Sequence, residues 1–166
     1  MLWKFAGYFR EKSGGSKVRA VVQKTNASTV SVNGKVTGRI ATGLVVLLGI
    51  KRGDSVEDAR YLMDKIIHLR IFNDSQDKMN LSLMDVKGEI LLISQFTLYG
   101  DARKGRRPSF TEAELPELAE PLFDYCINYL RDKGIKVETG VFGGDMLVGI
   151  NNDGPCTILL DTERIF

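Results

Sequence analysis

The chain has 166 residues, of which 43% are hydrophobic and 27% charged, with two Cys and one His. A chain of this length can bury roughly 70% of its unfolded surface, so its core needs no disulfide or metal. The cysteines lack partners at zinc-ligand spacing, and no apolar run reaches the ~18 residues that span a bilayer. We therefore expect a soluble cytoplasmic protein with no metal and no membrane segment. A single histidine also excludes most imidazole mechanisms, which leaves backbone, hydroxyl, amide or carboxylate groups for any chemistry.

The net charge of +2 is unevenly distributed, because residues 1–17 carry +3 and the remainder −1. We interpret residues 1–17, which end in the Gly/Ser-rich segment Ser13–Ser16, as an appended peptide and linker. The alternative is a helix that binds a partner or a membrane surface. Residues 18–166 then form one nearly neutral domain, so any RNA contact must be local. The basic run that qualifies consists of Arg103, Lys104, Arg106 and Arg107.

Short strand patterns occupy the first part of the domain. We predict strands at Val18–Gln23, Thr29–Val32 and Lys35–Ile40, with a hairpin turn at Asn33-Gly34, and a doubly buried strand at Gly43–Ile50. Asp54 or Ser55 then caps a predicted helix of about 14 residues, since apolar residues recur at helical spacing.

The second part mixes strands with one longer helix. We predict strands at Arg70–Asn73, Glu89–Gln95, Ile135–Thr139, Met146–Ile150 and Cys156–Asp161. A helix is predicted over Pro116–Asp132, with Gly134 after its end. Because strands outnumber helices without a strict alternation, we expect a single α+β domain. Its sheet should be mostly antiparallel, or an open barrel, with two main helices.

The first candidate site follows the predicted buried strand at Glu89. Ser94, Gln95 and Thr97 come where a rigid strand meets solvent, so their side chains and nearby amides can position a substrate or stabilise an oxyanion. The alternative is that these residues only cap the strand end.

The second candidate is the turn-rich segment Asn151–Thr157. Its Gly154-Pro155 bond can adopt the cis form at little cost, although spacing alone favours an ordinary reverse turn between two strands. We interpret Cys156 as a small buried strand residue and His68 as a packing or helix-end residue. Gly140–Gly144 lacks the rest of a phosphate-loop motif and is predicted to be a turn.

The two segments together resemble the paired signatures of the D-aminoacyl-tRNA deacylases, Ser-Gln-Xaa-Thr and Asn-Xaa-Gly-Pro-Xaa-Thr. They stand here as Ser94–Thr97 and Asn152–Thr157. The likeness extends over most of Val18–Thr162 and includes Lys104–Phe110 and Glu138–Gly143. Two separated motifs in the right order are far more specific than either alone.

This resemblance implies a homodimer that hydrolyses the ester between a D-amino acid and the 3′-terminal adenosine of tRNA, and also mischarged glycyl-tRNA. Gly154-Pro155 would be cis and would reach into the partner's pocket, with its carbonyls facing the substrate amine. Ser94 and Thr157 would also contact the substrate.

The resemblance also assigns the chemistry. Gln95 and the amide of Phe96 would hold the scissile carbonyl and its oxyanion. Thr97 would position the substrate, while water attacks with help from the adenosine 2′-hydroxyl, and no cofactor is implied. Two alternatives remain open, a non-catalytic tRNA-binding module and a general hydrolase of small esters.

Overall fold

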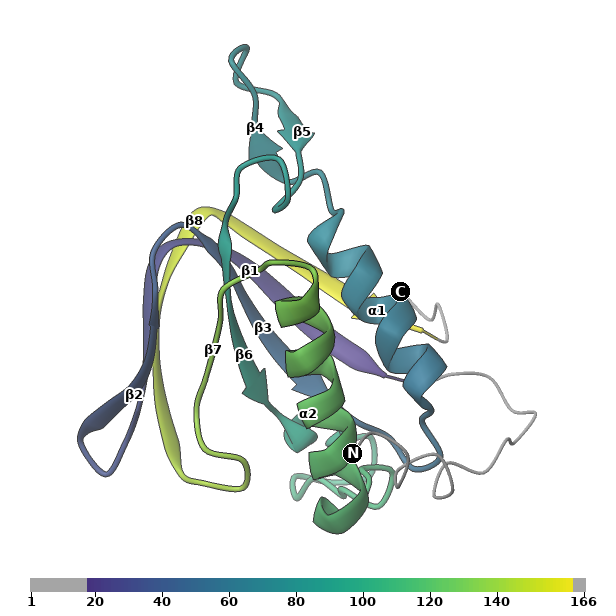
Figure 1. Ribbon diagram of the computed structural model, residues 1–166. Helices are drawn as coiled ribbons and strands as arrows, with labels where there is room; N and C mark the ends of the chain where they lie inside the picture. The colour runs from purple at the N-terminus through teal and green to yellow at the C-terminus, as the bar shows by residue number, and fades with distance from the viewer. Residues whose placement is uncertain (1–17, 163–166) are drawn as a thin grey trace, which may run out of the picture.

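The computed structural model describes residues 18–162, so the predicted appended peptide lies outside the described residues. Two helices, α1 (Val56–Ile67) and α2 (Pro116–Asp132), lie side by side on one face of a curved six-stranded sheet (Figure 1). The strands of that sheet are β1 (Arg19–Val32), β2 (Lys35–Ile40), β3 (Gly43–Gly49), β6 (Glu89–Ser94), β7 (Val137–Thr139) and β8 (Met146–Asp161). The short strands β4 (Phe72–Asn73) and β5 (Met79–Leu81) form a separate hairpin that projects beyond the sheet.

The order of the sheet is β2-β1-β3-β6-β7, with β8 also paired to β1. β1 is antiparallel to β2, β3 and β8, whereas β6 is parallel to both β3 and β7. The sheet curls until a Cβ placed on Gly38 in β2 would come within 2.8 Å of the Thr139 carbonyl oxygen in β7. The prediction of one α+β domain with two helices is confirmed, and its sheet is a nearly closed barrel.

Alternating side chains divide the apolar residues between the two faces of the sheet. Val22, Val46 and Leu92 point to the helix side, where the core includes Leu62 of α1 and Phe123 of α2. The opposite face buries a smaller cluster made of Val30, Ile40, Val45, Leu91 and Ile93. β3 is therefore buried on both faces, as its uninterrupted apolar run predicted.

Capping and turn residues in the sequence predicted the start of α1 and both ends of α2 correctly. Ser55 caps α1 and forms a capping box with Asp58, in which each side chain accepts a hydrogen bond from the other residue's backbone N–H. α2 has the predicted bounds, and Gly134 follows its end at φ 81°. His68 lies at the C-terminal end of α1, and its Nδ1 is 2.8 Å from the Asp64 carbonyl oxygen.

Two predictions about the long strands are wrong. A single strand, β1, starts at Arg19 and replaces the predicted pair Val18–Gln23 and Thr29–Val32. A single strand, β8, likewise replaces the predicted pair Met146–Ile150 and Cys156–Asp161. The segment Asn151–Thr157 is therefore not a reverse turn. Its irregular residues are absorbed by register shifts in the β1–β8 ladder, where the buried Thr25 hydroxyl donates to the Asn151 carbonyl oxygen at 2.9 Å.

Candidate functional site

The first motif lies where β6 ends beside β3. Ser94 is the partner of Leu48 in the parallel ladder, and the Gln95 amide donates to the Leu48 carbonyl oxygen at 2.8 Å. The chain then turns into a short 3-10 helix, η1 (Phe96–Tyr99). A buried strand thus delivers Gln95, and the helical turn orients the backbone after it.

Donor groups gather at this turn. Within residues 18–162, the backbone N–H groups of Phe96 and Thr97 have no recorded hydrogen-bond acceptor, as is usual for the first turn of a helix. The Gln95 side-chain amide donates to the Thr97 hydroxyl oxygen. No carboxylate or imidazole among these residues has a recorded hydrogen bond to the Thr97 hydroxyl. The arrangement can therefore bind a carbonyl oxygen or an oxyanion, but it gives Thr97 no base that would make it a nucleophile.

A cavity of about 280 Å³ opens beside these donors. Ser94, Gln95 and Phe96 of the first motif line one part of it, and more of its wall is apolar than polar. The other lining residues are Leu48, Ile50, Ile93, Glu114, Ala119, Phe123, Phe142, Gly143, Gly144, Asp145, Met146 and Val148. The predicted turn at Gly140–Gly144 is confirmed, but sequence reasoning missed that this turn closes one side of the cavity. The one signal in the sequence for a role of this turn was that Glu138–Gly143 belongs to the stretch that resembles the deacylase family.

The second motif forms a braced projection on β8. The Gly154–Pro155 peptide bond is cis, as the resemblance implied, and Gly154 has φ 119°, a conformation that favours glycine. Asn152 Oδ1 accepts from the Cys156 amide at 3.2 Å, and Asn152 Nδ2 donates to the Thr157 hydroxyl oxygen at 3.0 Å. Gly154 and Pro155 remain exposed, while Asn152 and Thr157 hold the shape of the segment.

A buried lysine supports the same segment from β1. Lys24 is only 7% exposed, and its ammonium lies 3.4 Å from the carboxylate of Asp153, the residue before Gly154. Gln23 Nε2 also donates to the Thr157 hydroxyl oxygen at 3.2 Å. No pattern in the sequence assigned either residue a role at this motif, since only the pairing of β1 with β8 brings them to it.

The two motifs do not meet within one chain. Ser94 is level with Leu48, Ala20 and Leu160 across the sheet, and Pro155 lies five positions before Leu160 along β8. At the rise of a β-strand this offset is roughly 15 Å. Neither Gly154 nor Pro155 lines the cavity beside Gln95. One copy of the chain therefore presents a pocket and, separately, an exposed Gly-Pro projection.

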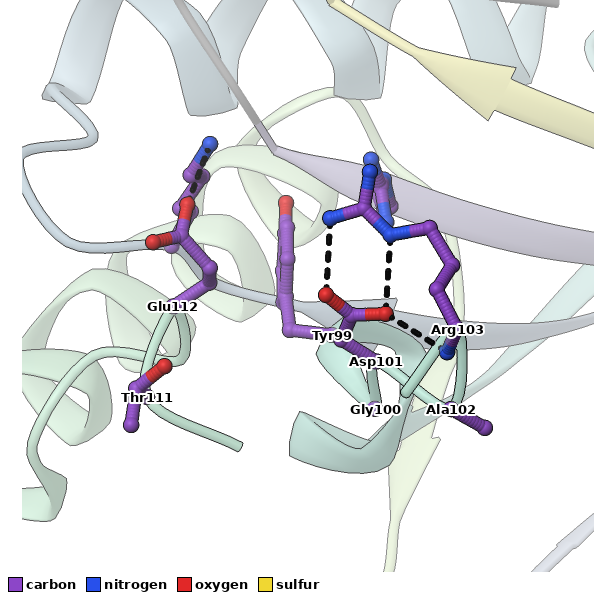
Figure 2. A pocket seen from close by; sticks show the side chains of 9 residues that line it. Tyr99, Gly100, Asp101, Ala102, Arg103, Thr111 and Glu112 are labelled. Atoms are coloured by element: carbon purple, nitrogen blue, oxygen red, sulfur yellow. Dashed lines mark hydrogen bonds and ion pairs between the residues drawn. The ribbon is translucent and has the colours of Figure 1, made fainter. Parts of the chain in front are cut away.

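The basic run lies on an exposed loop that follows η1. Asp101 and Ser109 close this loop with two backbone hydrogen bonds of 2.8 and 2.9 Å. Arg103 turns back onto Asp101 and donates to its carboxylate at 2.7 and 2.9 Å (Figure 2). These hydrogen bonds hold the pKa of the Asp101 carboxyl well below its usual range. Lys104, Arg106 and Arg107 are exposed, and no ion pair is recorded for them within the described chain.

A second, larger cavity of about 640 Å³ is lined by Tyr99 at the end of η1 and by the loop that follows it. Tyr99 stands in it between the Asp101–Arg103 pair and Glu112, whose carboxylate lies 2.9 Å from the Lys51 ammonium (Figure 2). The Arg19 guanidinium covers the Tyr99 ring at 4.8 Å and pairs with Asp161 at 2.6 Å. Because its charges are paired and it contains no residue of either motif, this cavity is less suited to the chemistry than the smaller one.

The cysteines play a packing role. Cys156 is 6% exposed in β8, which confirms the predicted buried strand residue, and Cys126 is fully buried in α2. Burial raises the pKa of the Cys126 thiol to about 12, so this group is not a nucleophile at neutral pH.

No described helix is long and apolar enough to cross a membrane. Within residues 18–162, no group of three or more His, Cys, Asp or Glu side chains is placed to hold a metal ion.

Known proteins share both the sequence and the fold. The profile of a family described as D-Tyr-tRNA(Tyr) deacylase matches residues 21–161. Relatives named D-aminoacyl-tRNA deacylase from Syntrophomonas wolfei subsp. wolfei and Clostridium botulinum (strain Eklund 17B / Type B) are 66% and 56% identical over 149 residues. Each alignment covers 90% of this chain and 100% of the relative.

Two solved structures share the fold. The c-Myc DNA Unwinding Element Binding Protein superposes with a TM-score of 0.80 at 39% identity, covering 86% of this chain and 97% of that chain. A structure described as a probable eukaryotic D-amino acid tRNA deacylase superposes with a TM-score of 0.76 at 20% identity, covering 87% and 99%, which shows the shared fold.

Fold and site together define a small α+β protein with a candidate pocket at the end of a buried strand, beside backbone and side-chain amides. The match to the family profile and to relatives of high identity shows which family within this class it belongs to. The chain belongs to the D-Tyr-tRNA(Tyr) deacylase family, as its two motifs indicated.

Proposed function

We propose that this chain is a D-aminoacyl-tRNA deacylase, which hydrolyses the ester of D-aminoacyl-tRNA and releases the free D-amino acid and tRNA. Its family and its 66% identical relative support this activity. The observation that carries the proposal is the cavity lined by Ser94, Gln95 and Phe96, beside backbone N–H groups of Phe96 and Thr97 for which no acceptor is recorded among the described residues. No described carboxylate or imidazole is hydrogen-bonded to the Thr97 hydroxyl.

The chemistry follows from these donors. The Gln95 side chain and the Phe96 amide hold the scissile carbonyl and stabilise the negative charge that develops on its oxygen. Thr97 does not line the cavity but positions the substrate through its hydrogen bond with Gln95, whereas Ser94 lines the cavity directly. Water attacks the ester with help from the adenosine 2′-hydroxyl, so the substrate supplies a group that the protein lacks. The protein uses no cofactor.

The complete site needs two copies of the chain. Neither Gly154 nor Pro155 lines the cavity of its own chain, and Pro155 is offset by five positions along β8 from the level of Ser94, so the projection of one copy enters the pocket of the other. An apolar surface beside the projection supports this homodimer. Val21 and Leu47 are half-buried and level with Leu159, which is 52% exposed on the face that the helices leave uncovered.

Stereoselection then depends on the backbone. The carbonyl groups of Gly154 and Pro155 face the substrate amine and leave no room for an L side chain, whereas D-aminoacyl and glycyl esters fit. Thr157 acts through the shape of this segment, because its hydroxyl accepts hydrogen bonds from Gln23 and Asn152.

The charged loop supplies the RNA contacts. Lys104, Arg106 and Arg107 receive tRNA phosphates, while Arg103 shapes the loop through Asp101. The enzyme acts in the cytoplasm, where it proofreads aminoacyl-tRNA by removing D-amino acids.

One assay tests the activity against the two alternatives. The enzyme should release D-Tyr from D-Tyr-tRNA, leave L-Tyr-tRNA intact, and leave a simple tyrosine ester nearly untouched. Salt-dependent tRNA binding without release of D-Tyr would instead indicate a binding module. Comparable hydrolysis of all three substrates would indicate a general esterase.

A further inference from the structure

Two phenylalanine rings form an exposed corner at the rim of the candidate pocket. The rings of Phe96 and Phe110 lie 5.2 Å apart between centroids, at an interplanar angle of 68°. Their residues are 57% and 37% exposed. Aromatic side chains of this size usually bury their faces, so a solvent-exposed pair beside a pocket indicates a surface that binds something.

The backbone holds this corner in place. The paired hydrogen bonds between Asp101 and Ser109 return the chain to the start of the loop, directly before Phe110. The Phe110 ring then lies on the backbone of Gly100, where an added Cβ would come within 3.0 Å of the ring. Because the loop is closed by its own backbone, the ring positions exist before a ligand binds.

The corner joins the pocket to the cations. Phe96 lines the cavity that holds Gln95, and Phe110 follows the loop that carries Lys104, Arg106 and Arg107. These three cations have no recorded carboxylate partner in the described residues, unlike Arg103. A polyanion leaving the pocket toward the loop would cross the two rings.

We propose that the Phe96–Phe110 corner is a stacking site for the unpaired nucleobase that precedes the terminal adenosine of tRNA. This inference rests on the proposed function, which places the aminoacyl-adenosine in the pocket. Stacking on aromatic rings next to cations is how proteins hold single-stranded nucleic acid. The base lies against one ring and meets the edge of the other, while its phosphate faces the basic loop.

Binding of uncharged fragments tests this site without requiring turnover. Adenosine and the dinucleotide CpA are compared on the wild-type protein and on Phe110→Leu, Phe110→Tyr and Phe110→Trp. We expect CpA to bind more tightly than adenosine to the wild type. Phe110→Leu should weaken CpA binding about 5- to 100-fold and leave adenosine binding unchanged, since stacking on the second base is lost. Phe110→Tyr and Phe110→Trp should retain CpA binding because each keeps an aromatic face.

Hydrolysis separates stacking from a structural role of Phe110. With D-aminoacyl-adenosine as substrate, Phe110→Leu should keep the wild-type kcat/KM, whereas with D-aminoacyl-CpA and full tRNA it should raise KM and spare kcat. Equal losses on all three substrates would contradict the proposal, because Phe110 would then only position Phe96. Unchanged CpA binding in Phe110→Leu would also overturn it, and capture of a protein at this corner in competition with CpA would do the same.

A matched control is Met79→Leu on the projecting hairpin, a residue 56% exposed and remote in the chain from the loop. It should leave all of these values unchanged. Failure of the wild type to hydrolyse any D-ester would contradict the proposed function. The comparison of CpA and adenosine binding would still test the stacking site, because it does not require hydrolysis.

Discussion

At the scale of single residues, Thr97 and Gln95 have different roles. The Thr97 hydroxyl oxygen accepts a hydrogen bond from Gln95, and no base is placed to remove its proton. We expect Thr97→Ala to keep kcat for D-aminoacyl-tRNA within about tenfold, because it removes a positioning contact only. Gln95→Leu should lower kcat about 10²- to 10³-fold, since it removes a donor to the developing oxyanion. Single-turnover deacylation measures both, and an inactive Thr97→Ala that still folds and binds substrate would contradict the scheme.

The sequence revealed some of these residues and hid others. Ser94–Thr97 and Gly154-Pro155 could be predicted because each motif is contiguous and polar where a strand pattern breaks. Phe142 and Phe110 could not, because their places depend on how distant loops close. The ion pair between Arg103 and Asp101 could not be predicted either, since composition alone groups Arg103 with the other three cations of the loop.

At the scale of elements, the parallel contact between β3 and β6 leaves no space for a side chain at Gly43. A Cβ at this position would lie 1.9 Å from the Glu89 carbonyl oxygen. We expect Gly43→Ala to lower the free energy of unfolding by about 3 kcal/mol, because backbone must move. Gly149→Ala is the control, since its Cβ would meet the Thr29 hydroxyl at 3.2 Å, and we expect a cost under about 1 kcal/mol. Urea denaturation compares the two, and equal costs would contradict the packing argument.

Glu89 also joins elements electrostatically. Its carboxylate accepts from the Ala41 amide at 2.9 Å and from Lys136 Nζ at 3.1 Å. These contacts, the Ala41 hydrogen bond first, lower the pKa of Glu89 below its ordinary value. A lowered folded-state pKa stabilises the protein above the unfolded pKa, and this stability is lost as pH falls through the folded value. We expect Glu89→Gln to cost about 1 kcal/mol at pH 7 and almost nothing once the carboxyl is protonated. Urea denaturation of both proteins, from pH 7 down to acidic pH at which the Glu89 carboxyl is protonated, measures how the cost of the substitution changes. A cost independent of pH would contradict this expectation.

Element prediction succeeded where the signals were local. The bounds of α2 follow from Pro116 and Gly134, and the cap of α1 from Ser55. The continuity of β1 and β8 was missed because Thr25, Asn26 and Asn151 look like turn residues, yet the two strands accommodate them as irregularities in one long ladder. The parallel pairing of β6 depends on non-local contacts that no short pattern encodes.

At the scale of the whole molecule, the account requires two copies of the chain. We expect Leu159→Lys to shift the protein from dimer to monomer, because it places a charge on the apolar face shared with Val21 and Leu47. Deacylation should fall with the dimer fraction, as sedimentation and activity at matched concentrations would show. Val36→Lys, at a residue 54% exposed on the β2 hairpin, is the control and should remain dimeric. An active monomeric Leu159→Lys would contradict the shared site.

The most direct measurement uses dimers of two different variants. One copy carries Gln95→Leu, which disables its pocket, and the other carries Pro155→Ala, which loosens its projection. The Pro155→Ala homodimer should hydrolyse both D- and L-Tyr-tRNA, and the Gln95→Leu homodimer neither. In the purified mixed dimer, the intact pocket of one copy receives the intact projection of the other. The account predicts that this mixed dimer hydrolyses D-Tyr-tRNA and rejects L-Tyr-tRNA, whereas hydrolysis of both would show that each chain's gate serves its own pocket.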